Sequence, residues 1–149
     1  MGYKFKFETL LSYRRNLVEL AQQRMAKEQW LLHNHIERLE RLRADRVRLI
    51  EEFEERKRQK MAASLFAFYI ESVNNKEGEI LTQVVVVESQ RQVFEKSRAE
   101  LLVRVKDRKI IEKTRERDYK IYLQEELRQE QKEADEMAVL RFGRDIISG

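Results

Sequence analysis

Apolar residues recur in steps of three and four along the first third of the chain, the spacing of a helix that packs against another helix. One row lies at multiples of seven, a second row fills companion positions, and a few polar residues interrupt both. The first row is Leu11, Val18, Met25, Leu32, Leu39 and Phe53, the second is Ala21, Leu42 and Leu49, and the interruptions are Arg14, Glu28, His35, Arg46 and Arg56. The pattern predicts a helix over about residues 9–58.

A second helical pattern predicts a longer helix over about residues 65–142. Its apolar positions are Phe66, Ile70, Val73, Ile80, Val84, Val87, Phe94, Leu101, Val105, Tyr119 and Tyr122. Further along, Arg108, Glu112 and Arg115 occupy positions where apolar residues would be expected. Gly143 follows the last periodic residues and is a natural helix stop, because glycine adopts the left-handed conformation that ends many helices.

The stretch RKRQKMAASLF at 56–66 is the predicted chain reversal, although it contains neither glycine nor proline, and we expect the bend within residues 58–66. Ser64 is the best candidate there to cap the second helix, because its hydroxyl can accept a hydrogen bond from an unpaired N–H one turn on. The predicted fold is therefore all-α: an elongated antiparallel two-helix coiled coil, or helical hairpin, with the second helix longer. We expect residues 1–149 to form a single domain.

Residues 1–8 alternate aromatic residues with lysine, which resembles a short strand for which the chain offers no partner. We expect a frayed arm that leads into the first helix. Phe5 and Phe7 could alternatively hold this arm on the second helix near Met137 and Leu140.

Composition supports the helical interpretation. Charged residues make up 39% of the 149 residues, and the chain has four glycines, no proline and no cysteine. These counts exclude disulfide scaffolds and cysteine-ligated zinc, and they leave few turn residues for a many-stranded fold. No apolar run approaches the roughly 20 residues that cross a bilayer. We expect a cytoplasmic protein.

The residues give little support for catalysis. His33 and His35 lie two apart and face different sides of a helix, so they are a poor metal pair, and Glu51, Glu52, Glu54 and Glu55 lie on an exposed helix. We expect no catalytic residue, no metal site and no cofactor, and therefore no enzyme. The short basic cluster at 56–60 follows these glutamates, which favours a solvated hairpin tip over binding of nucleic acid.

Two features point to protein partners. Leu65, Phe66, Phe68, Tyr69, Ile70 and Val73 form an aromatic and aliphatic patch beside the predicted bend, which is either a small local core or a docking surface. The second helix also changes charge. Residues 104–120 carry eight basic and four acidic side chains, whereas residues 121–136 carry two basic and six acidic ones. A helix that is polar on all sides either bridges through solvent or binds another protein.

The run EQKEADEMAVLRF at 130–142 resembles the end of the flagellar export protein FliJ family, and FKFETLLSYRR at 5–15 resembles its start. The aromatic pair after the bend, Phe66 and Tyr69, and the apolar Val73 and Ile80 fit the same family, so the resemblance covers essentially the whole chain. It implies an antiparallel coiled-coil stalk, similar to the central stalk of rotary ATPases, which serves flagellum biogenesis, and so motility and chemotaxis, without catalysis.

The resemblance also implies partners and the residues that contact them. The paired helix ends would insert into a hexameric flagellar export ATPase, and the region nearer the bend would contact the transmembrane export-gate protein. By position, the resemblance assigns ATPase binding to Arg14, Arg15, Gln131, Lys132, Asp135, Glu136 and Arg141. It assigns export-gate binding to Phe66, Tyr69, Val73 and Ile80. Lys76 departs from the large apolar residue that would suit the gate surface.

Some members of that family also escort empty export chaperones. The implied location is the cytosolic face of the inner membrane at the flagellar base, with membrane association through partners only and no nucleic acid. Two alternatives stay open. One is the equivalent stalk of a virulence injectisome, and the other is a generic coiled-coil scaffold or nucleic-acid adaptor.

Overall fold

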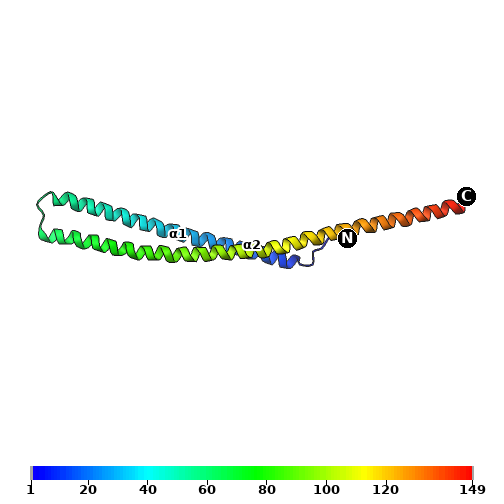
Figure 1. Ribbon diagram of the computed structural model, residues 1–149, viewed down its shortest axis with the longest axis horizontal. Coiled ribbons are helices and arrows are strands. Elements are labelled where there is room, and N and C mark those ends of the chain that lie inside the picture. The colour runs from blue at the N-terminus through cyan, green and yellow to red at the C-terminus, as the bar shows by residue number, and fades with distance from the viewer. Residues whose placement is uncertain (1, 149) are drawn as a thin grey trace. The chain divides into compact units, whose positions relative to one another are not determined.

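The computed structural model describes residues 2–148 and consists of two long helices joined by a short connection (Figure 1). Helix α1 spans Glu8–Lys57 with 50 residues, and helix α2 spans Ala63–Ser148 with 86 residues. Residues 58–62 connect them, and residues 2–148 contain no strand. The predicted antiparallel helical hairpin is confirmed, with its bend within 58–66 and its second helix longer.

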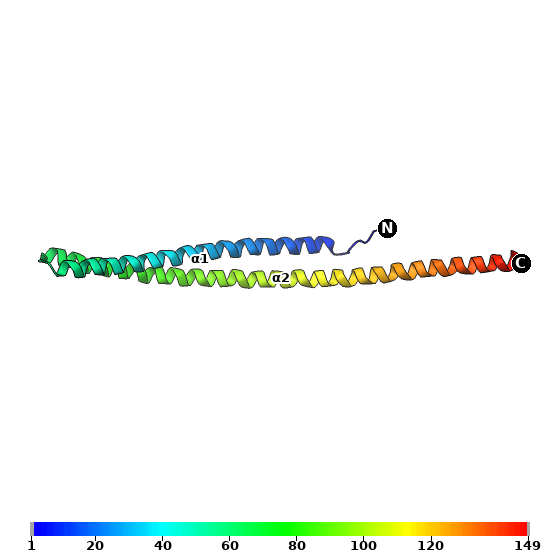
Figure 2. The same cartoon turned by 90° about the horizontal axis from the view of Figure 1, so that it is seen from above.

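The internal contacts divide the chain into two compact units, Glu19–Val103 and a second unit made of Met1–Val18 with Arg104–Gly149. In the first unit the helices lie side by side in both views (Figures 1 and 2). Their cross-helix contacts are antiparallel, because residue numbers rise along α1 as they fall along α2. The pairs are Arg24–Glu100, Glu28–Gln90, His35–Gln83, Arg46–Glu77 and Glu52–Tyr69.

The α1 side of the unit Glu19–Val103 follows the predicted heptads. Buried or half-buried residues succeed one another in alternating steps of three and four and form the seam, the face of α1 that packs on α2. The predicted apolar rows lie in this seam, and so do the predicted polar interruptions except Arg56, which is exposed. The seam residues are Ala21, Met25, Glu28, Leu32, His35, Leu39, Leu42, Arg46, Leu49 and Phe53. The sequence pattern of the first helix is therefore confirmed.

The α2 side differs from the prediction in half of its seam. The row Val73, Ile80, Val87, Phe94 and Leu101 does face α1, as predicted. The companion row is Tyr69, Lys76, Gln83, Gln90 and Ser97, and all but the first are polar residues that a hydrophobic pattern cannot reveal. Ile70 and Val84, which the pattern placed with the inward apolar positions, are exposed, so the prediction was wrong for these two. Phe66 is 45% exposed but packs on Phe53 of α1.

Two glutamines of this seam are hydrogen-bonded across the helix pair, whereas the Ser97 hydroxyl donates to the Phe94 carbonyl of its own helix at 2.6 Å. The Gln83 Nε2 donates to the backbone carbonyl of His35 at 2.9 Å. The Gln90 Nε2 donates to the Glu28 carboxylate at 2.5 Å and to the Glu28 carbonyl at 3.2 Å. Because burial of an unpaired polar group is costly, these bonds let the helices pack with a half-polar interface.

The unit made of Met1–Val18 and Arg104–Gly149 packs the N-terminal arm on α2. Leu11 is fully buried, Phe5 is 8% exposed, and Tyr3 lies 5.0 Å from Tyr119 and 5.2 Å from Tyr122 between ring centroids. The prediction of a frayed arm was wrong, because Tyr3 packs on α2 and Phe5 is buried. The alternative that the arm packs near residues 137–140 was also wrong, because Tyr3 packs on residues 118–122 instead.

Two predictions of helix ends were wrong. α2 continues through Gly143 to Ser148, and neither Gly143 nor any other described glycine has the positive φ of a helix-ending residue. Glycine inside a helix costs only about 1 kcal/mol relative to alanine, so it does not by itself end one. α2 also begins at Ala63, with the Ala62 carbonyl accepting the Phe66 N–H at 3.1 Å, so Ser64 is not its cap.

Candidate partner-binding surfaces

The aromatic patch beside the bend is partly a local core. The Phe53 ring of α1 stacks on Tyr69 at 5.1 Å and lies 5.3 Å from Phe66, between ring centroids. The Lys57 ammonium lies 4.1 Å from the Phe53 centroid, within the range of a cation–π contact. The Tyr69 hydroxyl donates to the Glu52 carboxylate at 2.8 Å, and burial, followed by this hydrogen bond, raises the pKa of Tyr69.

The rest of the patch faces outward. Phe66 is 45% exposed, Phe68 is 59% exposed and Ile70 is 43% exposed, whereas Tyr69 is only 4% exposed. The patch therefore contains both structures that the sequence allowed, a small core under one side and an exposed apolar surface on the other. Of the predicted gate residues here, Phe66 is accessible, whereas Tyr69 is buried against the Phe53 ring.

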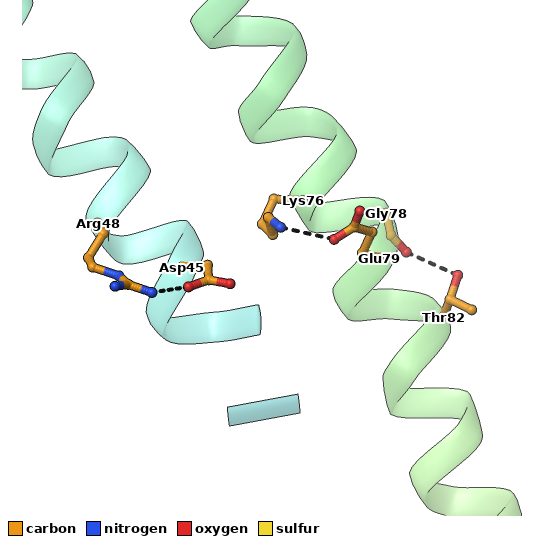
Figure 3. A network of polar contacts seen from close by, with 6 residues as sticks. All are labelled: Asp45, Arg48, Lys76, Gly78, Glu79 and Thr82. Carbon is orange, nitrogen blue, oxygen red and sulfur yellow. Dashed lines mark hydrogen bonds and ion pairs between the residues drawn. The ribbon is translucent and has the colours of Figure 1, made fainter. Parts of the chain in front are cut away.

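The other two predicted gate residues lie further along α2. Val73 and Ile80 are half-buried seam residues, and Ile80 lines a shallow groove with Arg43, Val47 and Leu81. Lys76, the departure noted in the sequence, also lies in the seam and pairs with Glu79 at 3.1 Å (Figure 3). The Thr82 hydroxyl donates to the Gly78 carbonyl one turn earlier in the helix (Figure 3). α2 is continuous through this interior glycine.

The predicted arginine pair of α1 is already engaged within its own unit. Arg14 contacts Asp107 at 3.1 Å, and Arg15 contacts Glu112 at 3.7 Å. Their side chains are 30% and 48% exposed, so each guanidinium keeps an outward edge. These ion pairs join α1 to α2.

The polar seam that the sequence indicated near residue 110 is present. The Nε atoms of Arg108 and Arg115 are buried and make no hydrogen bond within the described part of the chain. Their charges are nevertheless matched, because the Arg108 Nε lies 3.6 Å from Glu112 and the Arg115 Nε lies 3.2 Å from Glu8. Nearby, the Tyr3 hydroxyl donates to Asp118 at 2.8 Å.

The C-terminal part of α2 presents most of the predicted ATPase residues. Every residue over 123–142 is exposed. Gln131, Lys132, Asp135 and Glu136 line one open groove along this helix, together with Arg128, Val139 and Leu140. Arg141 is exposed but does not line that groove. Four of the seven predicted residues therefore share one accessible surface.

Sequence reasoning missed the apolar character of the last turns. Met137, Val139, Leu140, Phe142, Ile146 and Ile147 are 54–87% exposed. Exposed apolar clusters of this kind mark interaction sites. The signal was available in the sequence, but the expected stop at Gly143 separated Ile146 and Ile147 from the rest.

The histidines have ordinary surroundings. His33 is largely exposed and lies 3.1 Å from Glu37, while His35 is half-buried in the seam. Among the residues that the structure describes, no group of three or more potential metal ligands comes together. Within the same residues, none of the helices combines the length and apolar character that crossing a membrane requires.

Residues 3–145 match the family model described as flagellar FliJ protein. The chain belongs to the FliJ family. No curated protein matches the sequence. Among solved structures, the YscO homolog CT670 of Chlamydia trachomatis has a similar fold, with a TM-score of 0.75 and 22% sequence identity over 93% of this chain and 94% of that one. The FliJ match confirms the resemblance of the two chain ends, and with the YscO-like fold it supports a type III secretion stalk component.

Proposed function

We propose that this protein is the non-enzymatic stalk of the flagellar type III export apparatus, which couples a hexameric export ATPase to the export gate. The observation that carries the proposal is the fully exposed α2 segment at 123–142, within a match to the FliJ family over residues 3–145. A charged helix without a packing partner of its own is suited to being enclosed by another protein.

In this proposal the ATPase grips the groove of Gln131, Lys132, Asp135 and Glu136, with Arg141 at its margin. These side chains are exposed, and within the described residues Lys132, Asp135, Glu136 and Arg141 form no ion pair, so their charges are available to a partner. Arg14 and Arg15 contribute less directly. Their charges already pair with α2, so they would contact the ATPase only through their outward edges.

The gate surface in this proposal centres on Phe66, with Val73 and Ile80 further along α2. Tyr69 acts by holding Phe66 in place through the Phe53 cluster, since it is itself buried. Nucleotide hydrolysis in the ring would turn or rock the stalk and so change its contacts at the gate. The location follows from these partners: the cytosolic face of the inner membrane at the flagellar base. Export chaperones are further partners, which the stalk would escort.

The first test is ATP hydrolysis by the cognate flagellar export ATPase, titrated with this chain while sedimentation follows assembly of the ring. We expect stimulation and hexamer formation at about one chain per ring. A variant with Lys132→Glu and Arg141→Glu should lose both effects. The matched control is Arg91→Glu with Arg98→Glu, two exposed arginines that pair with Glu88 and Glu95 of the same helix.

Two results would count against the ring contact. The first is absence of stimulation by the unmodified chain, and the second is equal stimulation by both double variants. Restoration of motility, but not of injectisome secretion, in strains lacking the respective stalk would separate the flagellar role from the alternative injectisome role. A stable homodimer in sedimentation would instead favour the generic coiled-coil scaffold.

A further inference from the structure

The charges of α2 over residues 104–120 are sorted between two faces. All four acidic residues of this segment are engaged, three of them toward the N-terminal arm and α1. Asp107 pairs with Arg14, Glu112 with Arg15, and Asp118 accepts the Tyr3 hydroxyl. The fourth, Glu116, pairs along the helix with Lys120 at 3.6 Å.

The excess positive charge therefore lies on the opposite face. Lys106, Ile110, Lys113, Arg117, Lys120 and Leu127 are all exposed, and we call them the outer stripe. Arg117 is two residues from the inward Arg115, which places it about 200° away around the helix. Within the described residues Lys106, Lys113 and Arg117 form no ion pair, and the neighbouring Lys109 is also exposed and unpaired.

The outer stripe has the spacing of a helix-packing seam. From Lys106 to Lys120 its members succeed one another in steps of four, three, four and three, over about 21 Å of helix. The face of α2 that contacts α1 uses the same steps. Ile110 and Leu127, at 61% and 65% exposed, provide apolar contacts among the cations.

We propose that the outer stripe binds an acidic amphipathic α-helix of a partner protein. Charge complementarity and spacing together select this partner. The chain already uses arginine–carboxylate pairing between its own helices, because Arg14, Arg24 and Arg46 of α1 each form an ion pair with a carboxylate of α2. A partner helix with carboxylates facing the lysines and small apolar residues facing Ile110 would repeat that arrangement on the other side of α2.

Two other anionic partners fit less well. Insertion into a membrane surface needs a continuous apolar sector of about 100° or more, whereas lysine and arginine occupy the centre of the outer stripe. Nucleic acid would satisfy the cations by phosphate contacts, but it would leave Ile110 and Leu127 without apolar contact. An acidic amphipathic partner helix would contact both the cations and the apolar side chains of the outer stripe.

The outer stripe contains none of the residues assigned above to the ATPase or the gate. Failure of the stalk proposal would therefore leave this proposal standing, and failure of this one would leave the stalk proposal standing.

The test measures binding of a labelled synthetic helix of about 28 residues, with leucine at one core position of each heptad and glutamate at the other, by fluorescence anisotropy. The full-length chain should bind it, and affinity should fall as salt rises from about 50 to about 200 mM. A variant with Lys106→Gln, Lys113→Gln and Arg117→Gln should bind about tenfold more weakly, since each exposed charge pair contributes roughly two- to five-fold.

The matched control carries Arg91→Gln, Lys96→Gln and Arg98→Gln, which removes the same charge from another exposed part of α2. It should retain at least a third of the affinity, and circular dichroism should show equal helix content for both variants. The proposal is overturned if the peptide fails to bind or if both variants lose affinity equally. It is also overturned if anionic phospholipid vesicles or duplex DNA bind more tightly than the peptide and depend on the outer stripe.

Discussion

Gln83 offers a direct test of how the half-polar seam contributes to stability. Its side chain is 6% exposed and donates one hydrogen bond to the His35 carbonyl. That carbonyl also lies inside α1, where the helix supplies a backbone partner, so removal of the glutamine does not leave it unpaired. We therefore expect Gln83→Leu to stabilise the unit and Gln83→Ala to destabilise it.

The magnitudes follow from burial. A leucine at this position would be almost fully buried, which stabilises by about 1.5–3 kcal/mol relative to exposure. Loss of the hydrogen bond costs about 0.5–1.5 kcal/mol. The net gain for Gln83→Leu is then about 1 kcal/mol. Gln83→Ala loses the hydrogen bond and leaves unfilled space, so it should cost about 1–2 kcal/mol.

The assay is urea unfolding followed by circular dichroism, with amide exchange in the segment 35–42 as a local measure of the same unit. Gln92 is exposed on the same helix, so Gln92→Leu and Gln92→Ala are matched controls and should change stability by less than about 0.5 kcal/mol. If Gln83→Leu destabilises the unit by more than about 1 kcal/mol, the hydrogen bond contributes more than apolar burial and the reasoning fails.

Three further predictions concern the other unit. Leu11→Ala should destabilise it by about 2–4 kcal/mol in chemical denaturation, because Leu11 is fully buried, whereas Leu20→Ala at a 56% exposed position should cost less than about 0.5 kcal/mol. Burial, followed by the hydrogen bond to Asp118, raises the pKa of Tyr3 to about 12, so the arm contact should be intact below pH 10 and lost as pH rises through 12. Tyr3→Phe should abolish this pH dependence, as measured by amide exchange in residues 3–8. Gly143→Ala should slow amide exchange over residues 139–147 by about three- to five-fold, because the added methyl meets no atom within 4 Å and alanine favours the helix by about 1 kcal/mol.

The fold could be predicted where apolar residues repeat at the regular spacing of a helix-packing face. The rows of α1 could be assigned because leucine, valine and methionine mark them, and even Arg14 and His35 fell into place between apolar neighbours. Only half of the α2 seam could be predicted. Gln83, Gln90 and Ser97 lie in it because their polar groups form hydrogen bonds across or along the helices. No hydrophobic period marks such residues.

The candidate sites show the same limit. Phe66 and Phe68 were identifiable as an aromatic patch, but the burial of Tyr69 depends on Phe53, which lies on the other helix. The arm was misjudged because its partners, Tyr119 and Tyr122, are more than a hundred residues away in the sequence. The outer stripe was hidden because net charge along a segment does not show which face carries it.

The antiparallel pairing has a consequence for biosynthesis. Contacts near the bend join residues separated by 17 positions, whereas the Tyr3–Asp118 contact spans 115 positions. Closing a short loop costs less entropy than closing a long one, so pairing should start at the bend and proceed outward. At about 5–20 residues per second, Tyr3 waits roughly 6–23 s on the ribosome before Asp118 has been made. During that interval the aromatic arm lacks its partners on α2 and is accessible to chaperones.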